Sequence, residues 1–462
     1  MSIAQQNRTV YVVHCVDTEG PLFESTAAIF QRLRTMANIA VEPTRENLER
    51  IAHGDLDLGG KESLMKTLVD SHLLGYNDTW DKLDSMLEEL LSTEYRDRFT
   101  DSGGNGWRFN WFIMDHVGYL NNPRRRDMGY HNILDHYTEL LSSTGPKADE
   151  VHWHFHAMST YREAHICATS FLRSPNLIEG LCRSIIDRHW FPTCCRAGFH
   201  TERPDSHWFL EQWIPFDFSN QAIQATELDM QQPDMVNGRF GDWRRAPADW
   251  SPYHPSHDDY QVPGNCHRVI FRCLNVGTRA RLIDQQQVDL AFARANSGKP
   301  TILAFTNHDY RDMRRDIEEV HRMIVCSSSK YPRVEWLHSG ARDAASEVLG
   351  LDPTPPIKLT VSFEHTLESY RMRVETNTES FGPQPYLAVK TFDKNYLTDN
   401  FDVQIPRRAW AYVFDSQSIQ PMSVDKIGVA VNSGNGTTSV VVIDDVRRLV
   451  DPGAGVAERS VG

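Results

Sequence analysis

The expected fold is decided by the stretch TVYVVHCVDTEGPL, residues Thr9–Leu22 of the 462-residue chain. Its first half is rich in β-branched and aromatic residues, which predicts a buried strand. Two carboxylates, Asp17 and Glu19, follow the strand and lead into a Gly-Pro turn. In α/β folds, ligands bind at the carboxyl ends of strands. The two acids are therefore placed for metal binding or proton transfer, although a capping acid and a turn acid would give the same pattern.

Strand-like and helix-like segments alternate over residues 1–350. A helix-rich segment at about 25–100 follows the first strand, and a further helix is expected at Tyr130–Leu141. Apolar strands are expected at Trp107–Met114, Glu150–His156, Trp208–Phe218, Cys266–Leu274 and Thr301–Phe305. Strands that alternate with helices favour a parallel α/β architecture, with 25–100 as a helical insertion.

The character of the sequence changes at the Pro-rich segment Asp352–Pro356. Beyond it, apolar residues alternate with polar ones, as at Leu359, Val361 and Phe363, which is typical of strands with one buried face. Short runs of this kind continue to about residue 446, separated by Pro, Gly and Asn. Residues 356–446 are therefore expected to form a separate all-β accessory domain of the sandwich type, followed by a flexible tail at 451–462.

The stretch HWHFH, residues His152–His156, is the second informative feature. In a strand, alternate residues share a face, so His152, His154 and His156 can point in the same direction. At the carboxyl end of a strand, such a set of neutral imidazoles suits Zn²⁺ and similar ions. The competing interpretation is chance clustering in a chain that contains 20 histidines.

Five segments in this order resemble the polysaccharide deacetylase superfamily, the NodB-homology enzymes. The paired acids at Asp17-Thr18-Glu19-Gly20-Pro21 are similar to the first motif of the family, and His152–His156 to its metal-histidine motif. The remaining three segments are Arg196-Ala197-Gly198 with Trp208–Asp217, then Pro252–Ser256, and lastly Leu303–Asp309. The resemblance covers about Thr9 to Met323, outside the helical insertion.

The resemblance implies a distorted (β/α) barrel that carries a metal-dependent hydrolase. It implies a divalent metal, with Zn²⁺ as first choice, held by Glu19, His154 and His156. Asp17 is then the general base, oriented by Arg196, and His308 is the general acid. The implied substrate is an acylated saccharide or glycan precursor that loses an acetyl or similar group.

Two departures from the family pattern leave assignments open. The family's first motif has adjacent acids, whereas Thr18 separates Asp17 from Glu19, so either acid can be the base or the ligand. The second motif has the spacing H-x-x-x-H, which His152 and His156 match. We prefer the closer pair His154 and His156 and keep His152 as the alternative ligand.

Composition limits the partners of the chain. Its formal net charge of −14 argues against nucleic acid, because binding to phosphates needs clustered Lys and Arg. The sequence has no run of about 18 apolar residues, so no membrane span is expected. We see no signal peptide, which leads us to expect a cytoplasmic protein with reduced cysteines. Nothing in the sequence fixes an oligomeric state.

Two other functions remain open at this point. The same fold hosts C–N hydrolases that act on small non-sugar amides, and a helical insertion that closes over the site would favour such a substrate. The chain could also be a non-catalytic carbohydrate-binding or assembly protein with a degenerate site, in which case the C-terminal β-domain would bind the glycan.

Overall fold

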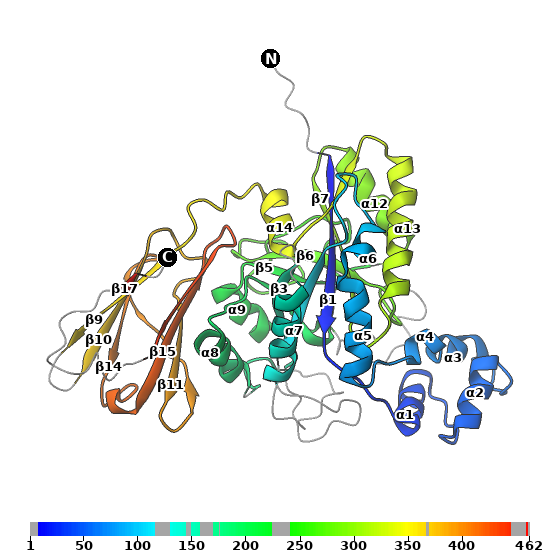
Figure 1. Ribbon diagram of the computed structural model, residues 1–462, viewed down its shortest axis with the longest axis horizontal. Helices are drawn as coiled ribbons and strands as arrows, with labels where there is room; N and C mark the ends of the chain where they lie inside the picture. The colour runs from blue at the N-terminus through cyan, green and yellow to red at the C-terminus, as the bar shows by residue number, and fades with distance from the viewer. Residues whose placement is uncertain are drawn as a thin grey trace, which may run out of the picture.

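The computed structural model describes most of the chain. The described residues are 8–115, 130–144, 149–157, 170–174, 176–223, 241–365, 369–444 and 459–460. They form an α/β barrel with a small helical layer on one side and two antiparallel sheets on the other (Figure 1).

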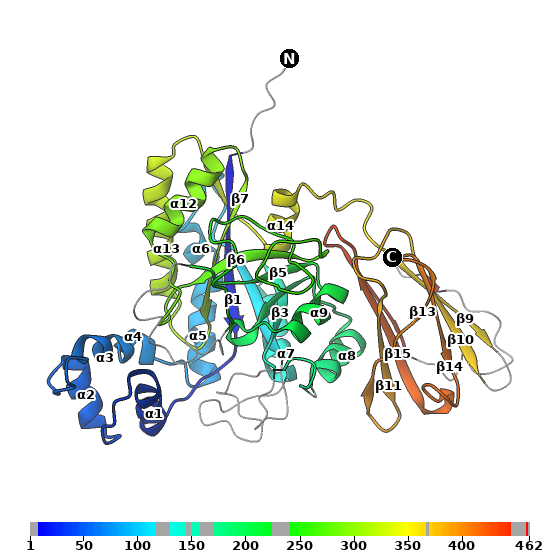
Figure 2. The same cartoon turned by 180° about the vertical axis from the view of Figure 1, so that it is seen from behind.

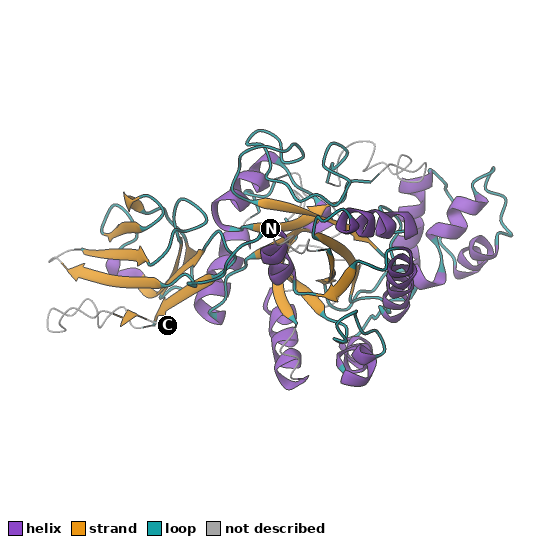
Figure 3. Cartoon of the chain, turned by 90° about the horizontal axis from the view of Figure 1, so that it is seen from above, coloured by secondary structure: helices purple, strands orange, loops and turns teal. Residues whose placement is uncertain are grey.

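Seven parallel strands close the barrel in the order β2-β3-β4-β5-β6-β7-β1, because β1 pairs with β2 as well as with β7. Their bounds are β1 Thr9–Thr18, β2 Phe109–Asp115, β3 Glu150–Phe155, β4 Cys194–Ala197, β5 Phe216–Asn220, β6 Val269–Asn275 and β7 Thr301–His308. An eighth strand, β8 (Glu335–His338), pairs with the first half of β1. Figure 3 shows the ring of strands from above. The expected parallel α/β barrel is confirmed.

Side chains of β1 alternate between two environments. Val12 and Val16 face outward and share an apolar cluster with the surrounding helices. Val13 and Cys15 face inward and share a cluster with side chains of the other strands. Since alternate residues of a strand share a face, Asp17 continues the inward row at its carboxyl end. The apolar interior of the barrel therefore ends in a carboxylate at this mouth.

Helices surround the ring of strands. They are α5 (Trp80–Leu91), α7 (Tyr130–Thr144), α8 (Asn176–Arg188), α9 (Pro204–Trp213), α12 (Gln285–Asn296), α13 (Arg314–Lys330) and α14 (Ala341–Leu349). The first six pack against the outside of the barrel, and α14 contributes alanines to the inner cluster. Among the described helices, none has the length and apolar character needed to cross a bilayer.

The strand expected at Trp208–Phe218 is wrong for its first half, where the structure has helix α9. Pro204 stands at the first turn of α9, a position that tolerates its missing N–H. Phe209 and Leu210 are buried on one side of the helix, whereas Trp208 is 48% exposed. Phe209 and Leu210, two of the apolar residues that predicted a strand, thus lie on the buried face of a helix, and β5 begins at Phe216.

The helical segment after β1 consists of two parts. Helices α1 (Thr26–Ala37), α2 (Arg45–His53), α3 (Glu62–Leu68) and α4 (Ser71–Leu74) enclose a small apolar cluster of their own. They lie beside the barrel, away from the C-terminal sheets (Figure 2). Helix α5 instead packs against the barrel through Leu83, Leu87 and Leu90, and α6 (Thr93–Asp97) follows it.

The C-terminal region contains two antiparallel sheets that share one apolar core. One has the order β13-β14-β10-β9-β17, with β9 Leu359–His365, β10 Tyr370–Thr376, β13 Asp402–Ile405, β14 Ala409–Phe414 and β17 Arg459–Ser460. The other has the order β12-β11-β15-β16, with β11 Tyr386–Thr391, β12 Tyr396–Leu397, β15 Val424–Asn432 and β16 Thr438–Ile443. Within the segment expected to be a tail, Arg459 and Ser460 pair with β9, and the rest lies outside the described residues.

Helix α8 connects the two parts of the molecule. Its buried side chains share one cluster with Trp153 and Phe155 of β3 and with Tyr386 of β11. Gly428 of β15 lies so close to α8 that a Cβ atom there would stand 2.6 Å from the Cγ2 atom of Ile185. The barrel and the C-terminal sheets therefore both pack against the same helix.

Candidate metal centre

The carboxyl ends of β1, β3, β4 and β7 meet at one mouth of the barrel. The structure brings together six of the seven site residues expected from the sequence: Asp17, Glu19, His154, His156, Arg196 and His308. Five of them have side chains that are at most 5% exposed. Residues separated by up to about 290 positions in sequence thus form one buried polar cluster, because parallel strands present their carboxyl ends at the same edge.

Glu19, His154 and His156 offer three donor atoms that face one another. Oε1 of Glu19 lies 3.3 Å from Nε2 of His156 and 3.7 Å from Nε2 of His154. The two Nε2 atoms are 2.9 Å apart. All three side chains are buried, and their donor atoms lie within 4.8 Å of one another, a grouping that could hold a metal ion.

The protonation of His154 suits a metal ligand. Its Nδ1 lies 3.1 Å from the carbonyl oxygen of Arg196, which can only accept, so Nδ1 carries the proton and Nε2 presents its lone pair. Burial lowers the pKa of His154 to about 3, against the opposing effect of Asp17. The ring is therefore neutral near pH 7, and the hydrogen bond to the backbone fixes both its tautomer and its orientation.

Gly198, directly after β4, makes room for His156. A Cβ atom at position 198 would lie 2.5 Å from Cδ2 and 2.6 Å from Cγ of the His156 ring. Real Cβ atoms do not approach so closely, so any other residue here would displace the imidazole. Phe199 then presents its ring at 4.8 Å from that of His156, in an edge-on arrangement. The turn after β4 thus shapes the position of one candidate ligand.

Asp17 is held by a buried arginine. Arg196 donates from Nε to Oδ1 of Asp17 at 2.8 Å and from Nη2 to Oδ2 at 3.2 Å. Its Nη1 donates to the carbonyl oxygen of Phe218 at 2.5 Å. Burial alone would raise the pKa of Asp17, but the guanidinium of Arg196 and the nearby histidines hold that pKa well below its ordinary value. Asp17 is therefore ionised despite its burial.

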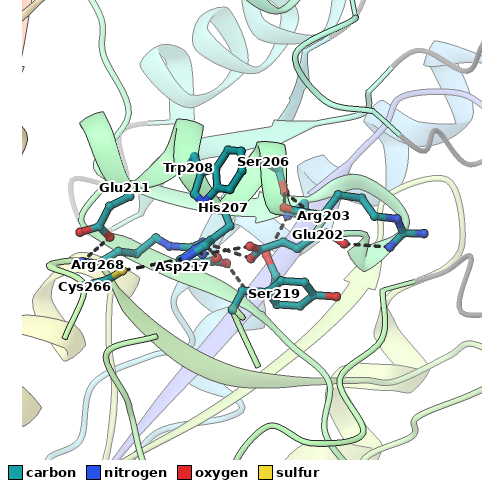
Figure 4. Close-up of polar contacts among 12 residues, drawn as sticks. Glu202, Arg203, Ser206, His207, Trp208, Glu211, Asp217, Ser219, Cys266 and Arg268 are labelled. Atoms are coloured by element: carbon teal, nitrogen blue, oxygen red, sulfur yellow. Dashed lines mark hydrogen bonds and ion pairs between the residues drawn. The ribbon is translucent and has the colours of Figure 1, made fainter. Parts of the chain in front are cut away.

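A second buried arginine, Arg268, has two carboxylate partners instead of one, and the pKa of one of these partners is raised (Figure 4). Arg268 is shared by two carboxylates, Glu202 at 3.0–3.1 Å and Asp217 in a very short contact. Burial and the charge of Glu202 raise the pKa of Asp217 well above its ordinary value. One cation cannot compensate two carboxylates in a site that excludes water. Asp217, within the third resembling segment, therefore lies in this separate cluster, where burial and Glu202 disfavour its charged form.

His308 is the last residue of β7 and the most accessible member of the candidate site, with 14% of its side chain exposed. Its Nε2 lies 4.0 Å from Oδ2 of Asp17 and 3.7 Å from Oε1 of Glu19. The ring packs on Tyr310, with the centroids 4.7 Å apart. His308 thus faces both acids from across the mouth while standing outside the Glu19, His154 and His156 triad.

Asp309 positions the turn that carries Glu19. Its carboxylate accepts from the backbone N–H groups of Glu19 at 2.8 Å and Gly20 at 2.9 Å, and from the hydroxyl of Tyr137 at 2.8 Å. Gly20 has a φ of +70°, a conformation that favours glycine. The structure thus shows Asp309 bonded to the turn of the candidate site.

His152 has a different partner. It faces the same side of β3 as His154, but its Nε2 lies 3.0 Å from Oε2 of Glu150, towards the amino end of the strand. Its ring packs against Phe112, with the centroids 4.9 Å apart. His152 is therefore not part of the triad.

The fourth resembling segment, Pro252–Ser256, also contributes no residue to the triad. Its Tyr253 packs in a cluster with Trp243.

Comparisons of the chain with protein-family models, with curated proteins and with solved structures find no match. The functional argument therefore depends on the geometry of the site itself.

Proposed function

We propose that the chain is a metal-dependent hydrolase that removes an acetyl or similar acyl group from a saccharide or saccharide precursor. The observation that carries the proposal is the buried triad of Glu19, His154 and His156 next to an ionised Asp17. Two histidines and one glutamate form a ligand set known from catalytic zinc sites, which supports Zn²⁺ as the metal. The sequence resemblance to polysaccharide deacetylases supports the acyl-saccharide substrate.

The residues of the chain divide the chemistry between them. A divalent cation, when bound, polarises the acyl carbonyl and lowers the pKa of water. Glu19, His154 and His156 would hold it, with room left for water and substrate. Asp17 takes the proton from the attacking water, and Arg196 keeps that carboxylate charged and oriented. His308, 4.0 Å from Asp17, gives a proton to the leaving amine or alkoxide.

The function is tested on protein purified without chelator. We expect about one divalent ion per chain, measured by elemental analysis, and release of acetate from a panel of N- and O-acetylated saccharides. A second panel of small amides separates the saccharide hydrolase from a general C–N hydrolase. Absence of both stoichiometric metal and acyl release would contradict the proposal, and glycan binding without turnover would favour a binding protein.

His308→Ala should retain the metal and lose most of the turnover of an N-acetylated substrate. General acid catalysis contributes about 10²–10⁴ in rate, because an amine leaves poorly without a proton. An activated aryl ester has a good leaving group, so its hydrolysis should fall much less. The measurement is kcat for both substrates with the same preparation, together with its metal content.

The two substrates act as each other's control in this experiment. If His308→Ala lowers metal occupancy, His308 is a ligand and the assignment of roles is wrong. If both substrates lose rate equally, the residue does not protonate the leaving group. Unchanged rates would remove His308 from the site.

A further inference from the structure

The turn Gly198–His200 after β4 has an unusual backbone. Phe199 and His200 have φ values of +53° and +51°, so two consecutive residues that carry side chains adopt the left-handed conformation. Each such residue carries a cost in free energy and persists only when its surroundings enforce it. Strained residues of this kind gather at functional sites.

The surroundings of this turn do enforce it. The indole Nε1 of Trp243 donates to the carbonyl oxygen of His200 at 2.9 Å. The backbone at Gly241 lies so close that a Cβ atom there would overlap the same oxygen. Within the turn, Gly198 and Phe199 contact His156, as described above, and His200 contacts Arg196. Three consecutive residues thus support two different members of the candidate site.

The proton on His200 can be placed from its partner. Nη2 of Arg196 lies 3.2 Å from Nδ1 of His200, and a guanidinium nitrogen can only donate. Nδ1 therefore accepts with its lone pair, and the neutral ring carries its proton on Nε2. Burial, together with the charge of Arg196, lowers the pKa of His200 well below its ordinary value, which agrees with this assignment.

His200 shares Nη2 of Arg196 with Asp17. The same nitrogen donates to Oδ2 of Asp17 at 3.2 Å, whereas the contact from Nε to Oδ1 is 2.8 Å. Oδ2 is also the oxygen that lies 4.0 Å from Nε2 of His308. The oxygen of Asp17 that faces His308 is thus the one with the longer hydrogen bond, and the nitrogen that makes this bond also donates to His200.

We infer that His200 is a positioning residue for the hydrolysis: its Nδ1 orients Arg196, and through it the base Asp17. The inference rests on the proposed function and adds a residue outside the sequence motifs. His200 acts through another side chain, so its loss should change kcat while KM and the metal content stay constant.

The test compares His200→Ala with His200→Asn. Alanine removes the acceptor, and kcat should fall about 10–100-fold, as is common when a supporting hydrogen bond is lost. Asparagine should restore most of the rate, because its Oδ1 can accept from Arg196 and asparagine tolerates a positive φ. NMR of ¹⁵N-labelled arginine gives a readout without turnover: the restrained Nη signals of Arg196 should be lost in His200→Ala and kept in His200→Asn.

A matched control exists in the second arginine cluster. His207 is buried, and its Nδ1 accepts from Nη2 of Arg268 at 2.7 Å (Figure 4). His207→Ala removes the same kind of bond and should leave kcat per folded molecule unchanged. Loss of metal in His200→Ala would overturn the inference, as would unchanged Arg196 signals. A raised KM in both His200 variants would show instead that Nε2–H contacts the substrate.

A wild-type protein that hydrolyses nothing would contradict the proposed function and leave the arginine signals to decide the role of His200. Active wild-type protein with a fully active His200→Ala variant would contradict the inference alone. The two failures are therefore distinguishable.

Discussion

His156→Ala is expected to release the bound metal and abolish hydrolysis while the barrel stays folded. The substitution removes one of three donor atoms from a buried site, and the two remaining donors leave the ion with too few protein ligands for a catalytic centre. The ring of His156 lies at the mouth against Phe199, outside the clusters that form the apolar core. Elemental analysis measures the metal, acyl release measures the activity, and circular dichroism checks the fold.

His152→Ala is the matched control for this experiment. It removes an imidazole from the same face of the same strand, but one paired with Glu150. We expect this variant to keep the metal and the activity. If His152→Ala removes the metal while His154→Ala or His156→Ala retains it, the wider spaced pair considered from the sequence is the correct one and the triad is not the metal site.

Asp17→Asn is the second substitution with a large expected effect, on rate and on stability. Loss of the general base should lower kcat by about 10²–10⁴. The amide also leaves the buried guanidinium of Arg196 without its charge partner, and such a loss costs about 3–5 kcal/mol. Glu19, His154 and His156 remain, so metal content should not change. Kinetics and denaturant unfolding measure the two effects separately.

Asp217→Asn is the control for Asp17→Asn. It shows how much stability is lost when a buried carboxyl group that contacts an arginine becomes an amide. Asp217 is as buried as Asp17 and also contacts an arginine, but burial and the charge of Glu202 raise its pKa. The amide therefore replaces a carboxyl group whose charged form is disfavoured, and Glu202 still compensates Arg268. Asp217→Asn should lose much less stability than Asp17→Asn and keep its activity. If the two variants lose equal free energy of unfolding, Asp17 is not ionised in the folded protein. If Asp17→Asn loses the metal, Asp17 is a metal ligand.

The parts of the site that could be predicted depend on two simple rules. Parallel strands bring their carboxyl ends to one edge, which places Asp17, His154 and His308 together from their positions after apolar runs. Alternate residues share a face, which predicts that His154 and His156 point the same way. Both rules use only neighbours in sequence and the direction of the strands.

Other features depend on contacts that no local pattern contains. Strand β4 has only four residues, and α9 has an apolar face that the sequence alone does not distinguish from a strand. Asp309 accepts from Glu19 across 290 positions. His200 acquires its role from a strained turn held by Trp243, and a single histidine outside any motif carries no signal of that kind.

Two parts of the chain flank the barrel: helices α1–α4 on one side and the C-terminal sheets on the other. Because α8 packs against the C-terminal sheets, these sheets depend on the barrel more closely than helices α1–α4 do. Helices α1–α4 have an apolar cluster of their own and meet the rest of the chain through polar contacts, such as that from Arg311 to the carbonyl oxygen of Leu73, so changes within their cluster leave the barrel core in place. The C-terminal sheets have no such freedom, because removing them would uncover the apolar side of α8 and, behind it, the strand that carries His154. Among related sequences, we therefore expect helices α1–α4 to vary more than the C-terminal sheets. The C-terminal sheets should be retained wherever the metal-binding residues are retained.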